Sequence, residues 1–146
     1  MSVPVEAAIW AALKARVETL PAAIVPQTSI AYPKVAFTKP TAGGKPSPYI
    51  EVRHLPNQTQ RLFINNGTHR RAGILQLSLY VPNAGSWTNE QTLGQAGRIA
   101  EHFPLDFKLS AHDVTVRISK APDIAQGLAD GAYWMTPISV SYDVIA

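Results

Sequence analysis

The stretch RRAGILQLSLYVP, from Arg70 to Pro82, decides the fold of this 146-residue chain. Side chains of a strand point alternately to its two faces, so this stretch predicts a strand with one apolar and one polar face. The apolar face carries Leu75, Leu77, Leu79 and Val81, and the polar face carries Gln76, Ser78 and Tyr80. A solvated face usually carries more Lys and Glu than this, which leaves open what the polar face contacts.

Four further strands are predicted by alternation, over residues 49–55, 60–65, 113–119 and 133–145. Asn66-Gly67 lies between the second of these and the 70–81 strand, and this dipeptide predicts a tight hairpin turn. Pro137 lacks a backbone N–H, so we expect the last strand to lie at a sheet edge or to contain a bulge.

Two helices are predicted. The first begins near Pro4 and ends at Pro21, with apolar residues at helical spacing. The second follows Thr88 and Gln91, which have capping-box spacing, and ends at Pro104. Its apolar stripe is predicted to consist of Leu93, Ala96, Ile99, Ala100 and Phe103, and Gly94 and Gly97 are expected to let it pack closely on a neighbour.

Residues 33–48 form a long loop rich in proline and glycine, and its prolines are expected to prevent regular strand pairing. Long loops without structure of their own are usually functional or disordered. We expect this loop to be flexible and to become ordered on assembly.

These elements predict one α+β domain over residues 1–146, with a mostly antiparallel sheet of four to five strands. Two helices are expected to pack on its apolar face. The hydroxyl-rich face then either contacts another subunit or is an ordinary solvated face.

The composition excludes several functions. The net charge of +3 is too small, and its basic residues too dispersed, to indicate a nucleic-acid binder. The chain has no cysteine, which rules out disulfides and cysteine-based catalysis or zinc sites. No signal-peptide core or membrane-length apolar run is present, so we expect a cytoplasmic protein without membrane contact.

Catalytic patterns are weak. The four histidines lack metal-ligand spacing, and His54 is expected to be a satisfied, half-buried residue. The acidic residues are isolated, and the segment AGGKPS lacks a complete phosphate-loop pattern. The sequence therefore predicts a protein that is not an enzyme and has no cofactor or metal.

A subunit or partner interface is the remaining kind of site. The loop lysines and the arginines of the 70–81 strand are candidates for contacts with phosphate or acidic protein, although they equally suit solubilising charges. The candidate interface residues are Lys39, Lys45, Arg70, Arg71, Gln76, Ser78, Ser139 and Ser141.

The order of four stretches resembles the tail terminator family of long-tailed bacteriophages and prophage tails. They are SIAYPKVAF with the helix before it, SPYIEVRHLPN, RRAGILQLSLYVPNAGSWTNEQTLGQAGRIAEHF and YWMTPISVSYDV. Together they cover most of the chain, although none contains a chemically required residue.

The resemblance implies a small structural virion protein at the head–tail junction, assembled in the host cytoplasm as a homohexameric ring. Such a ring caps the tail tube, ends its polymerisation and offers a surface to head-completion proteins. DNA passes through its channel without sequence-specific binding. The alternatives are another head–tail connector, a tail tube protein, a small enzyme or ligand-binding domain, and a nucleic-acid-binding module.

Overall fold

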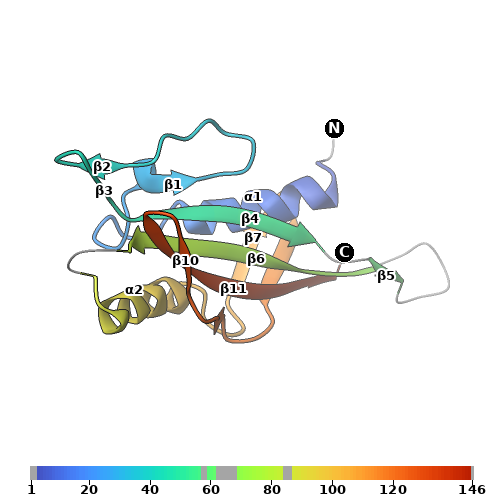
Figure 1. The fold of residues 1–146 in the computed structure, drawn as a ribbon. Coiled ribbons are helices and arrows are strands. Elements are labelled where there is room, and N and C mark those ends of the chain that lie inside the picture. The colour runs from blue at the N-terminus through green and yellow to red at the C-terminus, as the bar shows by residue number, and fades with distance from the viewer. Residues whose placement is uncertain (1–2, 57–58, 62–68, 84–86, 146) are drawn as a thin grey trace.

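The fold, taken from a computed structural model, combines two α-helices with a large curled sheet (Figure 1). The structure describes residues 3–56, 59–61, 69–83 and 87–145. Helix α1 spans Val5–Val17, helix α2 spans Asn89–Glu101, and a short 3-10 helix, η1, spans Gln27–Ser29. The strands are β1 (Ile30–Ala31), β2 (Thr41–Ala42), β3 (Lys45–Pro46), β4 (Tyr49–Pro56), β5 (Gln60–Arg61), β6 (His69–Pro82), β7 (Lys108–Ala111), β8 (Val114–Ile118), β9 (Asp123–Ile124), β10 (Leu128–Asp130) and β11 (Tyr133–Ile145).

The two longest strands form the centre of the sheet. β6 and β11 pair in antiparallel register from Tyr133 opposite Pro82 to Ile145 opposite Arg70. The main order is β1-β4-β6-β11-β8-β7, with β5 beside β6 and with β9 and β10 beside β11. β1 runs parallel to β4, and the other described pairs are antiparallel.

The predicted fold class is right, but the predicted strand number is too low, because the main sheet contains nine strands. The additional strands β1, β7, β9 and β10 are two to four residues long, whereas β5 is the described start of the predicted strand 60–65. Such short segments contain too few residues to display an alternating pattern. Most of the predicted strand 60–65, together with the Asn66-Gly67 turn, lies outside the described residues.

One hydrophobic core lies against one face of this sheet, which we call the core face. Leu75, Leu77 and Leu79 of β6 are fully buried, as are Ile138 and Val140 of β11. α1 contributes Ala8, Ile9, Ala12, Leu13 and Val17 to the same cluster, and α2 contributes Ala96, Ile99 and Ala100. Both helices thus bury their apolar residues in the core that this face of the sheet forms.

The start of α2 agrees with the sequence. Thr88 accepts a hydrogen bond from the Gln91 backbone N–H, and the Gln91 side chain accepts one from the Thr88 N–H. The predicted stripe is wrong at Leu93, which is 46% exposed. Gly94 and Gly97 are also not sites of close packing, because a Cβ atom at either position would meet no atom within 4 Å.

Pro137 lies inside the sheet rather than at its edge, because β11 has β6 on one side and β8, β9 and β10 on the other. The Ala125 N–H donates a hydrogen bond to the Pro137 carbonyl, so the backbone groups of Pro137 face β9. In a strand, the N–H and C=O of one residue point the same way. The missing N–H of Pro137 therefore leaves the long β6–β11 pairing intact.

The proline-rich loop contains regular pairing that the sequence did not predict. β2 and β3 form a small antiparallel hairpin, in which Thr41 pairs with Pro46 and Ala42 with Lys45. Gly43 and Gly44 adopt φ angles of 60° and 77° at its turn, which a two-residue hairpin of this type requires. Prolines are tolerated because each hairpin strand is an edge.

Candidate functional site

The sheet face opposite the core, which we call the outer face, is the main candidate site. It consists of alternate residues of β4, β6 and β11 at its centre. Gln76 lies between Arg53 of β4 and Ser139 of β11, and Ser78 lies between Glu51 and Pro137. Four predicted interface residues, Gln76, Ser78, Ser139 and Ser141, are therefore brought together on this face.

The charges at the centre of the outer face balance, because Arg53 and Glu51 form an ion pair there at 3.0 Å. Ser78 is buried at 4% exposure, while Gln76, Ser139 and Ser141 are half-buried. Exposed apolar side chains lie nearby, since Leu55 is 48% exposed and Ile74 is 37% exposed. Short hydroxyl groups lose little side-chain entropy when covered, so this surface is well suited to close contact with protein.

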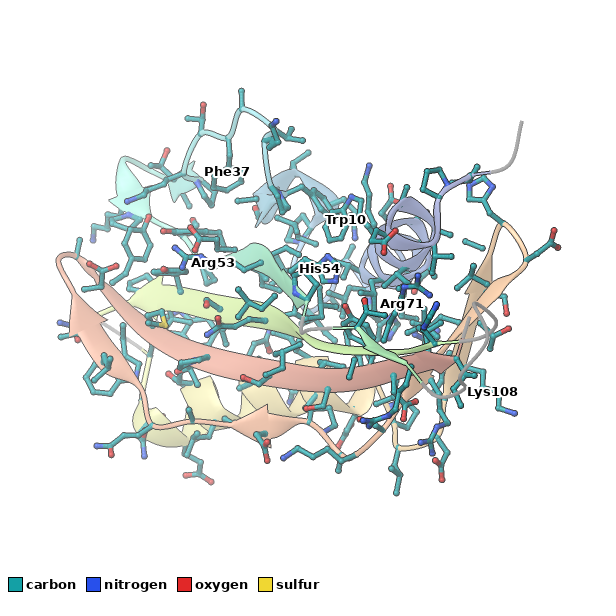
Figure 2. The ribbon with its side chains drawn as sticks, turned by 90° about the vertical axis from the view of Figure 1, so that its right-hand side faces the viewer. Trp10, Phe37, Arg53, His54, Arg71 and Lys108 are labelled. Carbon is teal, nitrogen blue, oxygen red and sulfur yellow. The ribbon has the colours of Figure 1, made fainter. Side chains whose placement is uncertain are left out.

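An aromatic cluster occupies one end of the outer face. The rings of Tyr49 and Tyr80 stack with centroids 4.6 Å apart, and Tyr133 meets Tyr49 edge-on at 5.1 Å. From the loop, Phe37, which Figure 2 labels, contacts Tyr49. The Lys39 ammonium lies 5.5 Å from the Tyr133 ring centroid. Burial raises the pKa of Tyr49 and Tyr80, so these phenols remain neutral hydrogen-bonding groups.

A charged network occupies the other end of the face. Arg117 of β8 binds Asp143 of β11 through two hydrogen bonds of 2.9 and 3.2 Å, and it also binds Asp106 at 2.9 Å. Arg70 lies 3.8 Å from the same Asp143 carboxylate. Arg70 is therefore part of a mutual ion-pair network and is far from Lys39 at the aromatic end.

The predicted basic residues do not form one patch. Arg71 points to the opposite side from Arg70 and lies 3.3 Å from Glu6 of α1, where Figure 2 shows it beside the helix. Lys45 is exposed in the β2–β3 hairpin. The sequence suggested one basic surface because Arg70 and Arg71 are neighbours in the chain, but neighbouring strand residues face opposite sides.

His54 is satisfied and half-buried, as predicted. Its Nε2 atom lies 2.6 Å from the Tyr142 hydroxyl, and its ring stacks on Trp10 at 5.8 Å between centroids. Burial lowers the pKa of His54 and raises that of Tyr142 to about 12, so both groups are neutral near pH 7. Through these contacts, His54 links β4 to α1 and β11, so we interpret it as a residue that stabilises the fold.

A second half-buried histidine joins the ends of the two helices. His102 lies at the C-terminal end of α2, and its Nε2 atom is 2.7 Å from the Thr19 hydroxyl. The Arg16 guanidinium donates a hydrogen bond to the His102 carbonyl at 2.9 Å. The Thr19 hydroxyl also lies 2.6 Å from the Arg16 carbonyl, so this Thr–His pair ties helix ends together.

The described residues, 3–56, 59–61, 69–83 and 87–145, contain no arrangement typical of a metal site or of a membrane-spanning helix. Within these ranges, no group of three or more His, Cys, Asp or Glu side chains is arranged to hold a metal ion. No helix in the same ranges is long and apolar enough to cross a membrane.

Solved structures share this fold. One protein without a functional description is 23% identical, with a TM-score of 0.73, and the match covers 93% of this chain and 92% of the other. A chain from the virion of a native gene transfer agent particle is 12% identical, with a TM-score of 0.62, and the match covers 99% and 100% of the two chains. These likenesses concern the fold.

No curated protein matches the chain. Residues 8–142 match the phage tail terminator protein family, and this match covers nearly the whole described fold. The chain therefore belongs to the phage tail terminator family and is a structural protein of the virion tail.

Proposed function

We propose that this protein forms a homohexameric ring that caps the phage tail tube, ends tube polymerisation and provides the joining surface for the head. Family membership supports the place of the protein in the tail. The observation that carries the ring is the outer face, which is apolar and hydroxylated at its centre, with exposed Leu55 and Ile74. These two exposed apolar side chains lie opposite each other on neighbouring strands, and exposed apolar groups that lie together often mark protein contact sites.

In this proposal, the ring has two partners besides itself. One side contacts the last ring of the tail tube protein, and the other contacts a head-completion or connector protein. DNA passes through the channel without sequence-specific contacts. A ring requires a heterologous interface, in which one patch of a subunit meets a different patch of the next subunit.

The ring is tested by measuring the solution mass with light scattering, followed by negative-stain imaging, alone and after mixing with tail tube protein. We expect single rings and tubes of limited length that carry one ring at an end. Stacked rings formed by the protein alone would instead indicate a tube protein. A monomer that also leaves tube growth unchanged would overturn the proposal.

The β2–β3 hairpin offers a second test, because all residues from Thr41 to Pro46 are exposed. Deleting these residues removes no core contact, so we expect unchanged thermal unfolding and weaker assembly or capping. A matched control replaces Thr41 and Lys45 by alanine and keeps the hairpin backbone. Equal ring yield and equal capping by the deletion variant would show that the hairpin has no role in assembly.

A further inference from the structure

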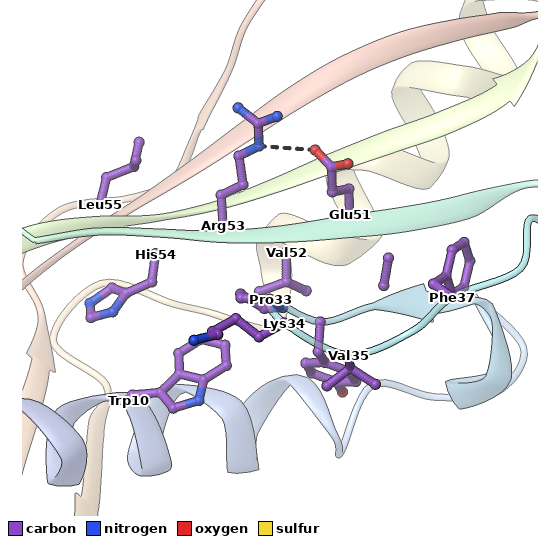
Figure 3. Close-up of a pocket in the computed structure, with 12 residues that line it drawn as sticks. Trp10, Pro33, Lys34, Val35, Phe37, Glu51, Val52, Arg53, His54 and Leu55 are labelled. Carbon is purple, nitrogen blue, oxygen red and sulfur yellow. Dashed lines mark hydrogen bonds and ion pairs between the residues drawn. The ribbon is translucent and has the colours of Figure 1, made fainter.

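A groove lies at the edge of the sheet between β4, α1 and the loop of residues 33–48, which we call the arm (Figure 3). β1 pairs only with Ile50 and Glu51 of β4, so beyond Glu51 this edge is open and has no described strand partner. The groove has a volume of about 830 Å³. Its lining is largely apolar and includes Trp10, Val35, Phe37, Val52 and Leu55.

The groove adjoins the outer face, so the two form one continuous surface. Leu55 lines the groove and also lies opposite Ile74 on the outer face. Val35, on the arm, is 59% exposed. Exposed apolar groups that lie together often mark protein contact sites, so this groove is well suited to receive an apolar side chain of another protein.

α2 carries an exposed apolar side chain on the other side of the molecule. Leu93, which the sequence places in the apolar stripe of this helix, is instead 46% exposed. α2 packs against β9 and β11, whereas the groove lies at β4. Figures 1 and 2 both show α2 and the arm on opposite sides of the long strands. The groove and α2 therefore suit the two different patches that a ring requires.

We propose that α2 of a second copy of this chain docks against the groove, with Leu93 inserted between α1 and the arm. This inference rests on the ring proposed above and names its interface. Each subunit gives α2 to one neighbour and its groove to the other, so one contact repeats around the ring. Part of the outer face is covered in the same contact, because it adjoins the groove at Leu55.

Charge complementarity supports α2 as the occupant of the groove. Residues 19–50 contain no aspartate or glutamate and three lysines, which are Lys34, Lys39 and Lys45. None of these lysines forms an ion pair with a described residue, and the same holds for Glu90 and Glu101 of α2. Lys34 lines the groove. Glu90 lies one helical turn from Leu93, so an inserted Leu93 brings Glu90 to the side of the groove, where it can pair with Lys34.

The surface beside Leu93 has room for the walls of the groove. A hollow of about 690 Å³ lies along α2 and is lined by Trp87, Glu90, Gln91, Gly94, Gln95 and Arg98. A Cβ atom at Gly94 would meet no atom within 4 Å, so the helix surface is open next to Leu93. Arg98 donates a hydrogen bond of 3.1 Å to the Gln95 side chain, which holds it against α2. The arm of the receiving copy can therefore enter this hollow while Leu93 occupies the groove.

Cysteine cross-linking tests the contact directly, because the chain contains no cysteine of its own. The single variants Val35→Cys and Leu93→Cys are assembled as a mixture and treated with a short bifunctional thiol reagent. We expect covalent dimers from the mixture and none from either variant alone, because each thiol meets the other patch rather than its own copy. A mixture of Val35→Cys with Leu105→Cys is the matched control, since Leu105 is also exposed but lies beyond the C-terminal end of α2.

A charge placed at Leu93 tests the same contact without new thiols. Leu93→Arg brings a positive charge into an apolar groove that Lys34 already lines, so we expect the ring yield to fall about tenfold or more. Leu105→Arg makes the same chemical change outside the contact and should keep the wild-type ring yield. Both leucines are exposed, so thermal unfolding of the two variants should stay close to that of the wild type.

The outcomes separate the two proposals. Rings that form without cross-links above the control, or with a normal yield from Leu93→Arg, would overturn the contact and leave the ring standing. Dimers from either single cysteine variant alone would show that like patches meet, which would also overturn it. Cross-links in the mixture without rings of the wild-type protein would support the contact and overturn the hexamer. Absence of both rings and cross-links would overturn both.

Discussion

The two faces of the β6–β11 ribbon differ in what determines their residues. On the core face, Leu77 and Ile138 lie opposite each other and are completely buried. On the outer face, Gln76 and Ser139 lie opposite each other one residue away and remain partly exposed. The core face satisfies the requirement of folding, whereas we propose that the outer face contacts other subunits.

The largest expected difference between the faces comes from truncating their central residues. Leu77→Ala removes a fully buried side chain and leaves a cavity, so we expect a loss of about 2–5 kcal/mol in the free energy of unfolding. Gln76→Ala on the outer face should change it by less than about 0.5 kcal/mol. Chemical denaturation of the two variants measures both values, and similar losses would contradict the division between the faces.

This division is what the sequence predicted best. The strand ending at Ile145 has the predicted bounds of residues 133–145, and the capping box at Thr88 is also confirmed. A long alternating strand and a capping box can be predicted because both patterns depend only on residues that are close together in the sequence.

The short elements and the composition of the surfaces were harder to predict. β7 spans only four residues. The turn after it contains His112 and Asp113 with positive φ angles of 50° and 65°, and because neither residue is glycine, the sequence does not indicate a turn there. The open edge of β4 depends on where β1 stops pairing, which is a tertiary property. The division of Arg70 and Arg71 between two surfaces was predictable from strand alternation alone.

A glycine on the core face gives the second largest effect. A Cβ atom at Gly73 would lie 2.5 Å from the Tyr142 hydroxyl oxygen and 2.9 Å from the Leu55 carbonyl oxygen. Gly73→Ala therefore forces the strands or the tyrosine to move, and we expect a loss of about 1–3 kcal/mol. Denaturation curves measure this loss, and wild-type stability would show that the contact relaxes freely.

A pH titration tests the two half-buried histidines, His54 and His102. Burial lowers the pKa of both His54 and His102, so the unfolded chain takes up protons more readily than the folded protein. The free energy of unfolding should therefore fall as the pH decreases from about 7 to about 5. The variant His54→Gln should show a smaller decrease over the same range, and an unchanged slope would exclude His54 as a cause.

The smallest expected effect is a gain in stability on the surface of α2. Gly94 is an exposed residue in the middle of this helix, and an added Cβ atom would meet nothing within 4 Å. Alanine is favoured over glycine inside a helix, so Gly94→Ala should raise the free energy of unfolding by about 0.5–1 kcal/mol. Measured beside Gly73→Ala, this variant makes the same chemical change with the opposite sign. A loss of stability at Gly94 would mean that surroundings outside α2 restrict this position, and the contrast between buried and exposed glycines would fail.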